Sequence, residues 1–325
     1  MNFQKIIVIE KPEFYLEVAI TKAKKRAALK KVRGKKFEKK KTLELYKLQI
    51  TAQTLRSMLN KITDSYPYTY DLEPFYIELL KITMNYEKLK KSLGAVNWAQ
   101  KQIQVLYKKI NYRMKMAETT EDIGNQFKIF LGRTSSVFKQ IKKELAYLEE
   151  CRKVLRKFPV IKTDMFTIVI AGFPNVGKST LLAALTGSKP KVASYPFTTL
   201  DIRLGYTNEI QFIDTPGLLD RLLTQRNDIE LKSVLALKHL ADFIIFVFDP
   251  TETCGYNVKE QYNLLKQIKT KFKLPLLVVL NKVDILDLTS LKSFPVEDYL
   301  LVSGETKVGI KQVLGKINSF KDSIK

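Results

Sequence analysis

The sequence has few of the residues that most often build disulfides, zinc sites or histidine-based active sites. Its 325 residues include one histidine, His239, and two cysteines, Cys151 and Cys254. Two cysteines so far apart do not indicate a disulfide framework and favour a reduced interior. A single histidine argues against a zinc site or a histidine catalyst. The longest apolar runs, at 243–248 and 274–280, have the length of strands and are too short to span a membrane.

Glycine and proline are scarce between residues 14 and 158, where Lys, Leu, Glu, Gln, Ala and Ile dominate. This composition favours helices, and long helices with short connections are typical of an antiparallel bundle. Val137, Ile141, Leu145 and Leu148 recur at helical spacing and form one apolar stripe. We therefore predict helices over 14–32, 36–65, 74–92, 95–118 and 134–157, with breaks at Gly34, 64–71, Gly94 and 124–132.

Acidic residues are also scarce, but only in this N-terminal part. Residues 1–160 carry 35 Lys and Arg against 16 Asp and Glu, whereas residues 161–325 carry 21 against 17. Twelve of the twenty residues at 22–41 are basic. Such asymmetry points to a polyanionic partner, and we expect the 22–41 run to contact phosphates without choosing a base sequence. An anionic membrane surface is the competing interpretation.

A phosphate-binding loop follows an apolar run. Residues 172–180 read Gly-Phe-Pro-Asn-Val-Gly-Lys-Ser-Thr after the expected strand 166–171 and before the expected helix at 181–185. In this context backbone N–H groups of the loop point at anionic oxygens. Lys178 is expected to reach the outer phosphates, and the Ser179 hydroxyl to bind a magnesium ion. The loop residues predicted to contact the nucleotide are Asn175, Val176, Gly177, Lys178, Ser179 and Thr180.

A second motif, Asn281-Lys-Val-Asp284, comes about a hundred residues later and directly after another apolar run. The Asp284 carboxylate is expected to accept hydrogen bonds from guanine N1–H and the N2 amine, which adenine lacks. The stem of Lys282 is expected to pack over the base, and Asn281 to tie this loop to the phosphate loop. A further loop, Ser303-Gly304-Glu305, is expected to support guanine through backbone N–H groups, with Gly304 still able to supply one.

Between these motifs lies Asp214-Thr-Pro-Gly217, after the expected strand 210–213. Asp214 is predicted to hold magnesium through a water molecule, and the Gly217 N–H to contact the γ-phosphate, so that this loop senses whether that phosphate is present. Upstream, Thr199 is favoured over Thr198 as a magnesium ligand in the GTP state. In the following segment, Arg221 and Arg226 are interpreted as solvated residues, with contacts to RNA or the γ-phosphate as the alternative.

The four motifs occur in order, each at the carboxyl end of an expected strand, where open α/β sheets bind ligands. The predicted fold is an α/β P-loop G domain with a mostly parallel sheet at 161–325, preceded by an all-α bundle at 1–160. The predicted activity is hydrolysis of GTP to GDP and phosphate with Mg²⁺. Asn175, Lys178, Thr199 and Gly217 are the catalytic candidates.

Leu218 follows Gly217, at the position where Ras-like enzymes place a water-orienting glutamine. Leucine cannot orient water, so we expect slow intrinsic hydrolysis or help from another group. Asn175 suggests a potassium ion beside the phosphates. The alternative is that Asn175 only braces the loop, as asparagine often does in turns.

The flanks of these motifs resemble the Nog family of Obg-type GTPases. The resemblance rests on 214–220, 226–230, 236–240, 252–256 and 260–264, and it extends to 74–76, 131–133, 144–149 and 158–159. It implies an RNA-associated GTPase that assembles the large ribosomal subunit and engages its precursor through the helical domain. The chain resembles the short prokaryotic, archaeal form, and we expect a cytoplasmic monomer without membrane association.

Three other functions remain open at this stage. A signalling or stress GTPase would use the helical domain to bind a protein, and its complex would be insensitive to salt. A non-catalytic scaffold would keep GTP as a structural ligand. Membrane association is the least favoured, because no segment combines basic and aromatic faces well enough to promote it.

Overall fold

The computed structural model divides the chain into two compact units, each described here by itself. Of the described residues, Leu72–Thr83 and those from Lys157 onward form the sheet unit, and those at 3–67 and 84–156 form the helical unit. The structure describes residues 3–67, 72–193, 195, 201–207, 209–287, 291 and 294–324, with the side chains of residues 225 and 229 left aside.

Among the described residues, the sheet unit has seven strands in the order β2-β3-β4-β1-β5-β6-β7. From β4 to β7 neighbouring strands are parallel, whereas β3 is antiparallel to both β4 and β2. The interior strand β5 is buried along its whole length, which explains its uninterrupted apolar sequence. The strands are β1 (Phe166–Ala171), β2 (Lys191–Ala193), β3 (Ile202–Tyr206), β4 (Ile210–Asp214), β5 (Phe243–Phe248), β6 (Leu276–Leu280) and β7 (Leu300–Leu301).

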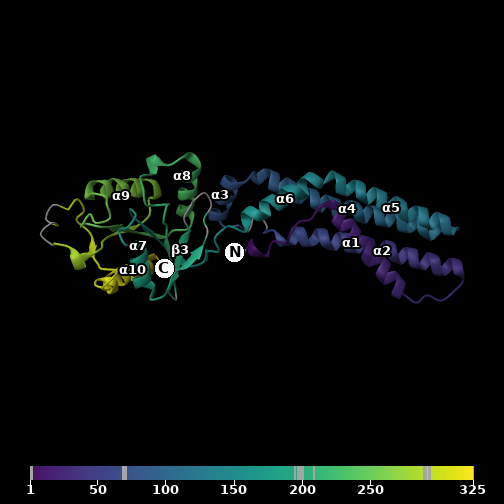
Figure 1. The fold of residues 1–325 in the computed structure, drawn as a ribbon, viewed down its shortest axis with the longest axis horizontal. Helices are drawn as coiled ribbons and strands as arrows, with labels where there is room; N and C mark the ends of the chain where they lie inside the picture. Colours follow the sequence, from purple (N-terminus) through teal and green to yellow (C-terminus); the bar gives the residue numbers. More distant parts are fainter. Residues whose placement is uncertain are drawn as a thin grey trace. The chain divides into compact units, whose positions relative to one another are not determined.

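Helices cover both faces of this sheet (Figure 1). One face carries α7 (Lys178–Thr186) and α10 (Ile310–Ile324), and the other carries α8 (Asp228–Ala236) and α9 (Val258–Phe272). Helix α9 begins with a capping box in which Asn257 and Glu260 bond each other's backbone N–H groups. Short 3₁₀ turns form η2 (Leu223–Gln225), η3 (Leu237–His239) and η4 (Val283–Ile285). His239 thus lies in a 3₁₀ turn after α8.

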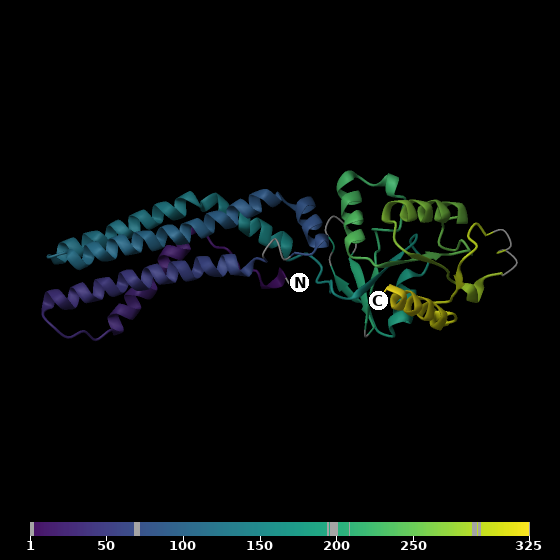
Figure 2. The ribbon, with the colours of Figure 1, turned by 180° about the vertical axis from the view of Figure 1, so that it is seen from behind.

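The helical unit consists of long helices that run side by side in both views (Figures 1 and 2). Their buried residues recur at three and four positions, so that each helix turns one stripe toward the shared core. The predicted bundle is therefore present. Its elements are η1 (Phe3–Lys5), α1 (Pro12–Leu29), α2 (Lys36–Ser65), α4 (Tyr86–Met116), α5 (Thr120–Gln140) and α6 (Lys142–Leu155).

Several predicted helix boundaries are wrong, and capping residues explain the difference. The break expected at Gly94 falls instead before α4, where the Asn85 side chain accepts a hydrogen bond from the Lys88 N–H. Helix α5 begins at the Thr119 cap and continues through the glycines expected to interrupt it. A helical glycine costs only about 1 kcal/mol, which the packing of such long helices offsets. The helix expected over 134–157 is divided at Ile141.

Helix α3 (Pro74–Thr83) belongs to the sheet unit, although its residues lie within the range predicted for the N-terminal domain. It packs against α8. Its Tyr76 hydroxyl donates to the Pro159 carbonyl at 3.0 Å and accepts from the Ile161 N–H at 3.1 Å. These buried bonds attach α3 to the segment that leads into β1.

Candidate functional site

The predicted motifs meet at one edge of the sheet. The loops at 172–177, 281–284 and 303–305 follow the parallel strands β1, β6 and β7, and Asp214 ends β4. Because parallel strands present their carboxyl ends at the same edge, residues distant in sequence come into contact there. The contacts within the edge decide which predicted residues act together.

Lys178, the first residue of α7, is folded back onto the loop that precedes it. Its Nζ donates to the carbonyl oxygens of Gly172 and Phe173 at 2.9 and 2.8 Å. The side chain is buried, and burial lowers the pKa of this lysine below its ordinary value, despite the nearby Asp214 and Asp220 carboxylates. A buried cation whose strongest partners are carbonyl oxygens is suited to receive an anionic group.

Ser179 and Asp214 form a second pair at the site. The Ser179 hydroxyl donates to Asp214 Oδ2 at 2.5 Å, whereas the fully buried Oδ1 has no hydrogen-bond partner among the described residues. Burial raises the pKa of the Asp214 carboxyl, and the Ser179 hydrogen bond offsets only part of this. A carboxylate and a hydroxyl so placed are oxygen ligands of the kind that Mg²⁺ prefers.

Asn281 joins three of the motifs. Its Nδ2 donates to the Val176 carbonyl at 2.9 Å, and its Oδ1 accepts from the Gly304 N–H at 3.0 Å. Gly177 adopts a φ of 93°, and a Cβ there would overlap Asn281, so this position requires glycine. The Gly304 N–H, which we expected to face the base, is thus bonded to Asn281. It links the loop at 303–305 to the loop at 281–284.

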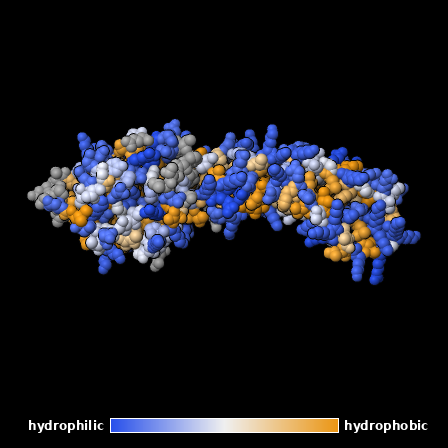
Figure 3. Space-filling model, viewed as in Figure 1, coloured by the Kyte–Doolittle hydropathy of each residue, from blue (hydrophilic) through white to orange (hydrophobic). Residues whose placement is uncertain are grey.

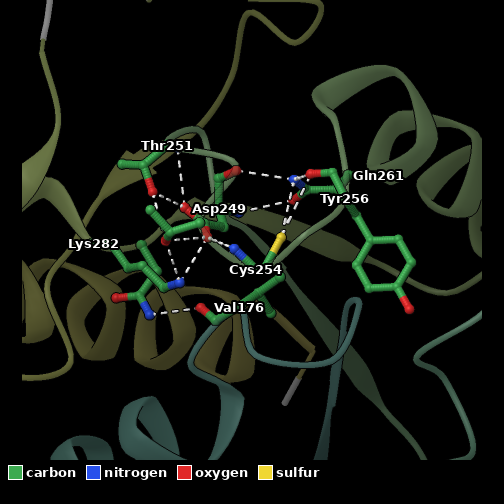
Figure 4. A network of polar contacts seen from close by, with 9 residues as sticks. Val176, Asp249, Thr251, Cys254, Tyr256, Gln261 and Lys282 are labelled. Carbon is green, nitrogen blue, oxygen red and sulfur yellow. Dashed lines mark hydrogen bonds and ion pairs between the residues drawn. The ribbon is translucent and has the colours of Figure 1, made fainter.

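Lys282 belongs to a network that sequence reasoning missed (Figure 4). Its Nζ donates to Asp249 Oδ2 at 2.7 Å and to the Thr253 hydroxyl at 2.8 Å. Asp249 also accepts from Thr251 and from the Cys254 N–H. Burial by itself would raise the pKa of Asp249, but these donors hold it below its ordinary value. Asp249 directly follows β5, which is the same signal that revealed the other motifs.

Replacing Asp249 should therefore release the Lys282 side chain, in the loop at 281–284, from its fixed position. We expect Asp249→Ala to lower the free energy of unfolding by about 3 kcal/mol, because it leaves Lys282 without its buried partner. Affinity for guanine nucleotide should fall about tenfold as Lys282 loses its fixed position. Thr251→Val is the matched control, since it removes one donor to the same carboxylate and should cost about 1 kcal/mol. Thermal denaturation and titration with a fluorescent nucleotide measure both effects, and equal losses in the two variants would contradict this role.

The remaining predicted residues of this edge differ in burial. Asp284 is exposed in η4, and Thr180 and Glu305 are exposed as well. Ser303 is buried, and its hydroxyl accepts from the Thr306 N–H at 3.1 Å. Asn175 has a left-handed backbone with φ 61°, a conformation that asparagine tolerates better than most residues. Its side chain is exposed and forms no hydrogen bond within the described part of the chain.

The segment after Asp214 is closed by an internal set of bonds. The Gly217 N–H donates to Asp220 Oδ2 at 2.5 Å, and the Gly217 carbonyl accepts from Arg226 at 3.0 Å. Arg226 is almost fully buried, with its guanidinium 3.5 Å from Asp220 Oδ1, so it differs from the solvated residue that we expected. Burial lowers its pKa. Arg221 is half exposed and pairs with Glu230, as a surface arginine does.

Leu218 and the two candidate magnesium-binding threonines have different outcomes. Leu218 is buried, at 1% exposed, and so is unsuited to orient water. Thr198 and Thr199 lie outside the described residues. Tyr195, just before them, is buried and donates from its hydroxyl to the Ser233 carbonyl at 2.7 Å.

Comparison with known proteins identifies both parts of the chain. A family model described as the NOG1 N-terminal helical domain matches residues 3–162, and one described as a 50S ribosome-binding GTPase matches residues 167–282. Nucleolar GTP-binding protein 1 of Drosophila melanogaster is 32% identical over 290 residues, which is 88% of this chain. The chain belongs to the NOG1 family of GTPases. The predicted family, the P-loop GTPase domain and the fold class are thereby confirmed.

Relatives in the NOG1 family differ in length. An uncharacterized protein of Methanocaldococcus jannaschii is 41% identical over 288 residues, covering 88% of this chain and 81% of that protein. The chain spans under half the length of the Drosophila and Dictyostelium discoideum relatives, at 44% and 43%. A crystal structure of nucleolar GTP-binding protein 1 from Plasmodium falciparum is 32% identical with a TM-score of 0.43, covering 51% of this chain and 94% of that one. Within the described residues, no helix has the length and apolar character needed to cross a membrane.

Proposed function

We propose that this NOG1-family protein binds GTP at the carboxyl edge of the sheet and hydrolyses it to GDP and phosphate. The observation that carries the proposal is the pair of hydrogen bonds that join Asn281 to Val176 and Gly304. They hold the phosphate loop and the loops at 281–284 and 303–305 in one site. The phosphates lie along the loop at 175–180. Asp284 accepts from guanine, Lys282 packs over it, and the loop at 303–305 supports it.

Mg²⁺ is the cation that P-loop GTPases generally use, and the residues present fit it. The unpartnered buried oxygen of Asp214 and the Ser179 hydroxyl form a compact oxygen pair beside the phosphate loop. Together with Thr199 they would hold Mg²⁺ against the outer phosphates, where it supplies positive charge to developing negative charge. Lys178 adds a second cation on the same side, and the Gly217 N–H turns to the γ-phosphate once Asp220 releases it.

Potassium is proposed to assist hydrolysis through Asn175. We expect hydrolysis to be at least about tenfold faster in potassium chloride than in sodium chloride. A potassium ion would stabilise the negative charge that develops on the phosphates, which the apolar Leu218 side chain cannot do. Asn175→Gly should erase the difference, since glycine keeps the left-handed backbone but removes the amide oxygen. Initial rates of phosphate release measure this. Equal rates of the wild type in the two salts would leave Asn175 as a backbone brace only.

We propose that the cellular role is assembly of the large ribosomal subunit, with the nucleotide state gating attachment to its RNA. The Drosophila melanogaster relative is named nucleolar GTP-binding protein 1, and the family model that matches residues 167–282 is described as a 50S ribosome-binding GTPase. The basic run 22–41 supports an RNA partner. All but one of its twelve Lys and Arg residues are exposed, and hydrophilic side chains project where α1 leads into α2 (Figure 3).

Co-sedimentation with purified ribosomal subunits and naked RNA tests this role. The full chain is tested with GDP and with a non-hydrolysable GTP analogue across a salt series. We expect binding to the large subunit that is stronger with the analogue. Equal binding to every RNA, lost steeply with salt and blind to nucleotide, would contradict the gated role. A salt-insensitive complex with a protein would favour the signalling alternative.

A further inference from the structure

The exposed face of α4 carries large apolar side chains at regular spacing. Trp98 is 39% exposed, Val105 57%, Tyr112 63% and Met116 62%. Their separations of seven, seven and four residues place them on one side of the helix. The opposite side is buried in the helical unit through Val96, Ala99, Ile103, Ile110 and Met114. The exposed row is therefore not part of the core, and its side chains are available to contact a partner.

Lysines alternate with these apolar residues on the same face. A lysine follows three residues after Trp98, Val105 and Tyr112, at positions 101, 108 and 115, and each is exposed. The only acidic residue of α4 is Glu87, in its first turn, where it pairs with Lys90. The next acidic side chains are Glu118, Glu121 and Asp122, beyond the end of α4. We call the set Trp98, Lys101, Val105, Lys108, Tyr112, Lys115 and Met116 the α4 stripe.

The order of apolar and basic residues in the α4 stripe distinguishes a membrane surface from a nucleic acid as its polyanionic partner. Helices that lie in a membrane interface separate an apolar face from a charged one, whereas here both kinds of residue share a face. Proteins that bind single-stranded nucleic acid combine basic groups for the backbone with aromatic rings for the bases. Trp98 and Tyr112 are fourteen residues apart, or about 21 Å along the helix, so the α4 stripe is long enough for several nucleotides.

The α4 stripe ends beside the basic run 22–41. The Nζ of Lys41, near the beginning of α2, donates to the Ala117 carbonyl at the end of α4 at 3.0 Å. This bond holds the two basic segments together within the helical unit. An RNA strand leaving the phosphate-binding run therefore meets lysines and aromatic rings next.

We propose that the α4 stripe is a binding site for single-stranded RNA, on which bases stack against Trp98 and Tyr112 while Lys101, Lys108 and Lys115 contact phosphates. The inference rests on the proposed RNA partner, but it assigns different residues and a different chemistry from the 22–41 run. That run contacts backbone phosphates alone. The α4 stripe adds a contribution that requires unpaired bases.

Trp98 provides the test, because it is the only tryptophan of the chain. The full protein is titrated with a short unstructured adenosine-rich RNA and with a duplex of equal charge. We expect saturable quenching of tryptophan fluorescence by the single strand and little by the duplex. Tyr112→Ala should weaken single-strand binding on the order of five- to a hundredfold without changing the salt dependence.

Two further variants separate stacking from charge. Replacing Lys101, Lys108 and Lys115 by Gln should reduce the slope of log affinity against log salt by about 0.7 per lysine. Phe14→Ala removes an aromatic ring of α1 that is 46% exposed and lies off the α4 stripe, so it should leave binding unchanged. Circular dichroism verifies that every variant is folded.

The possible results distinguish this inference from the proposed function. RNA binding that is equal for wild type and Tyr112→Ala, without quenching, would overturn the α4 stripe and leave the run at 22–41 as the RNA contact. Failure of wild type to bind any RNA would overturn both proposals. Quenching by phosphatidylserine vesicles but not by RNA would show a membrane site and overturn the inference.

Discussion

Asp284→Asn is expected to convert the protein from a guanine to a xanthine nucleotide binder. The Asp284 carboxylate is exposed at the carboxyl edge of the sheet, next to the Lys282 anchored by Asp249. Guanine offers it two donors, N1–H and the N2 amine. An asparagine would place its own amide donor opposite the amine, whereas the C2 carbonyl of xanthine accepts from that donor. We expect the affinity for GTP to fall by about 10³-fold or more.

Nucleotide titration with GTP and XTP measures this change. Glu305→Gln is the matched control. It also neutralises an exposed carboxylate, in the loop at 303–305, but this residue lies outside the Asn-Lys-x-Asp motif. It should leave the preference for GTP intact. Unchanged preference in Asp284→Asn would mean that the base does not lie where the motif predicts. The loop at 303–305 would then need to be reconsidered as the site of recognition.

Lys178→Met is expected to raise the stability of the nucleotide-free protein while abolishing its activity. Burial lowers the pKa of Lys178, so its charged form costs folding free energy at neutral pH when no phosphate is bound. An apolar side chain of similar length should stabilise the protein on the order of 1 kcal/mol, or about 2–4 °C in Tm. Loss of a cation aimed at the phosphates should reduce kcat by at least about 10²-fold.

The sign of the pH dependence follows from the lowered pKa. The cost of charged Lys178 is fully present below its folded-state pKa and shrinks as pH rises toward the unfolded-state pKa. The Tm advantage of Lys178→Met should therefore narrow in alkaline buffer. Lys189→Met, which replaces an exposed lysine, is the control and should show neither effect. A Lys178→Met variant that is less stable than wild type without nucleotide would contradict this account.

The interior strands of the sheet and the motifs after them can be predicted from the sequence for one physical reason, whereas the edge strand β2 is not predicted. An interior parallel strand is apolar on both faces, and the polar residues that follow it stand out sharply, as at Asp214 and Asn281. The same signal is present at Asp249 after β5. Asp249 lies outside the four nucleotide motifs, so the sequence assigns it no role, and only the structure makes it the buried partner of Lys282.

Helix boundaries in the N-terminal part were less predictable. The glycines at 94 and 132 predict breaks where α4 and α5 continue unbroken, because capping residues and not helical glycines set these boundaries. Asn85 and Thr119 mark the true starts by accepting hydrogen bonds from backbone N–H groups three residues on. The grouping of α3 with the sheet unit rests on its packing against α8 and on the buried hydroxyl of Tyr76, which no local pattern reveals.

The sequence by itself determined the kind of protein, because strand periodicity, loop chemistry and charge are local properties of the chain. A phosphate loop, a guanine motif and a basic helical part can each be recognised within a short window. Only the tertiary structure decided which residues act together. Packing buries Arg226 against Gly217 and brings Asp249 to Lys282. It leaves Trp98 and Tyr112 exposed beside lysines. Burial and contact arise from packing between distant segments, and the order of residues alone does not specify that packing.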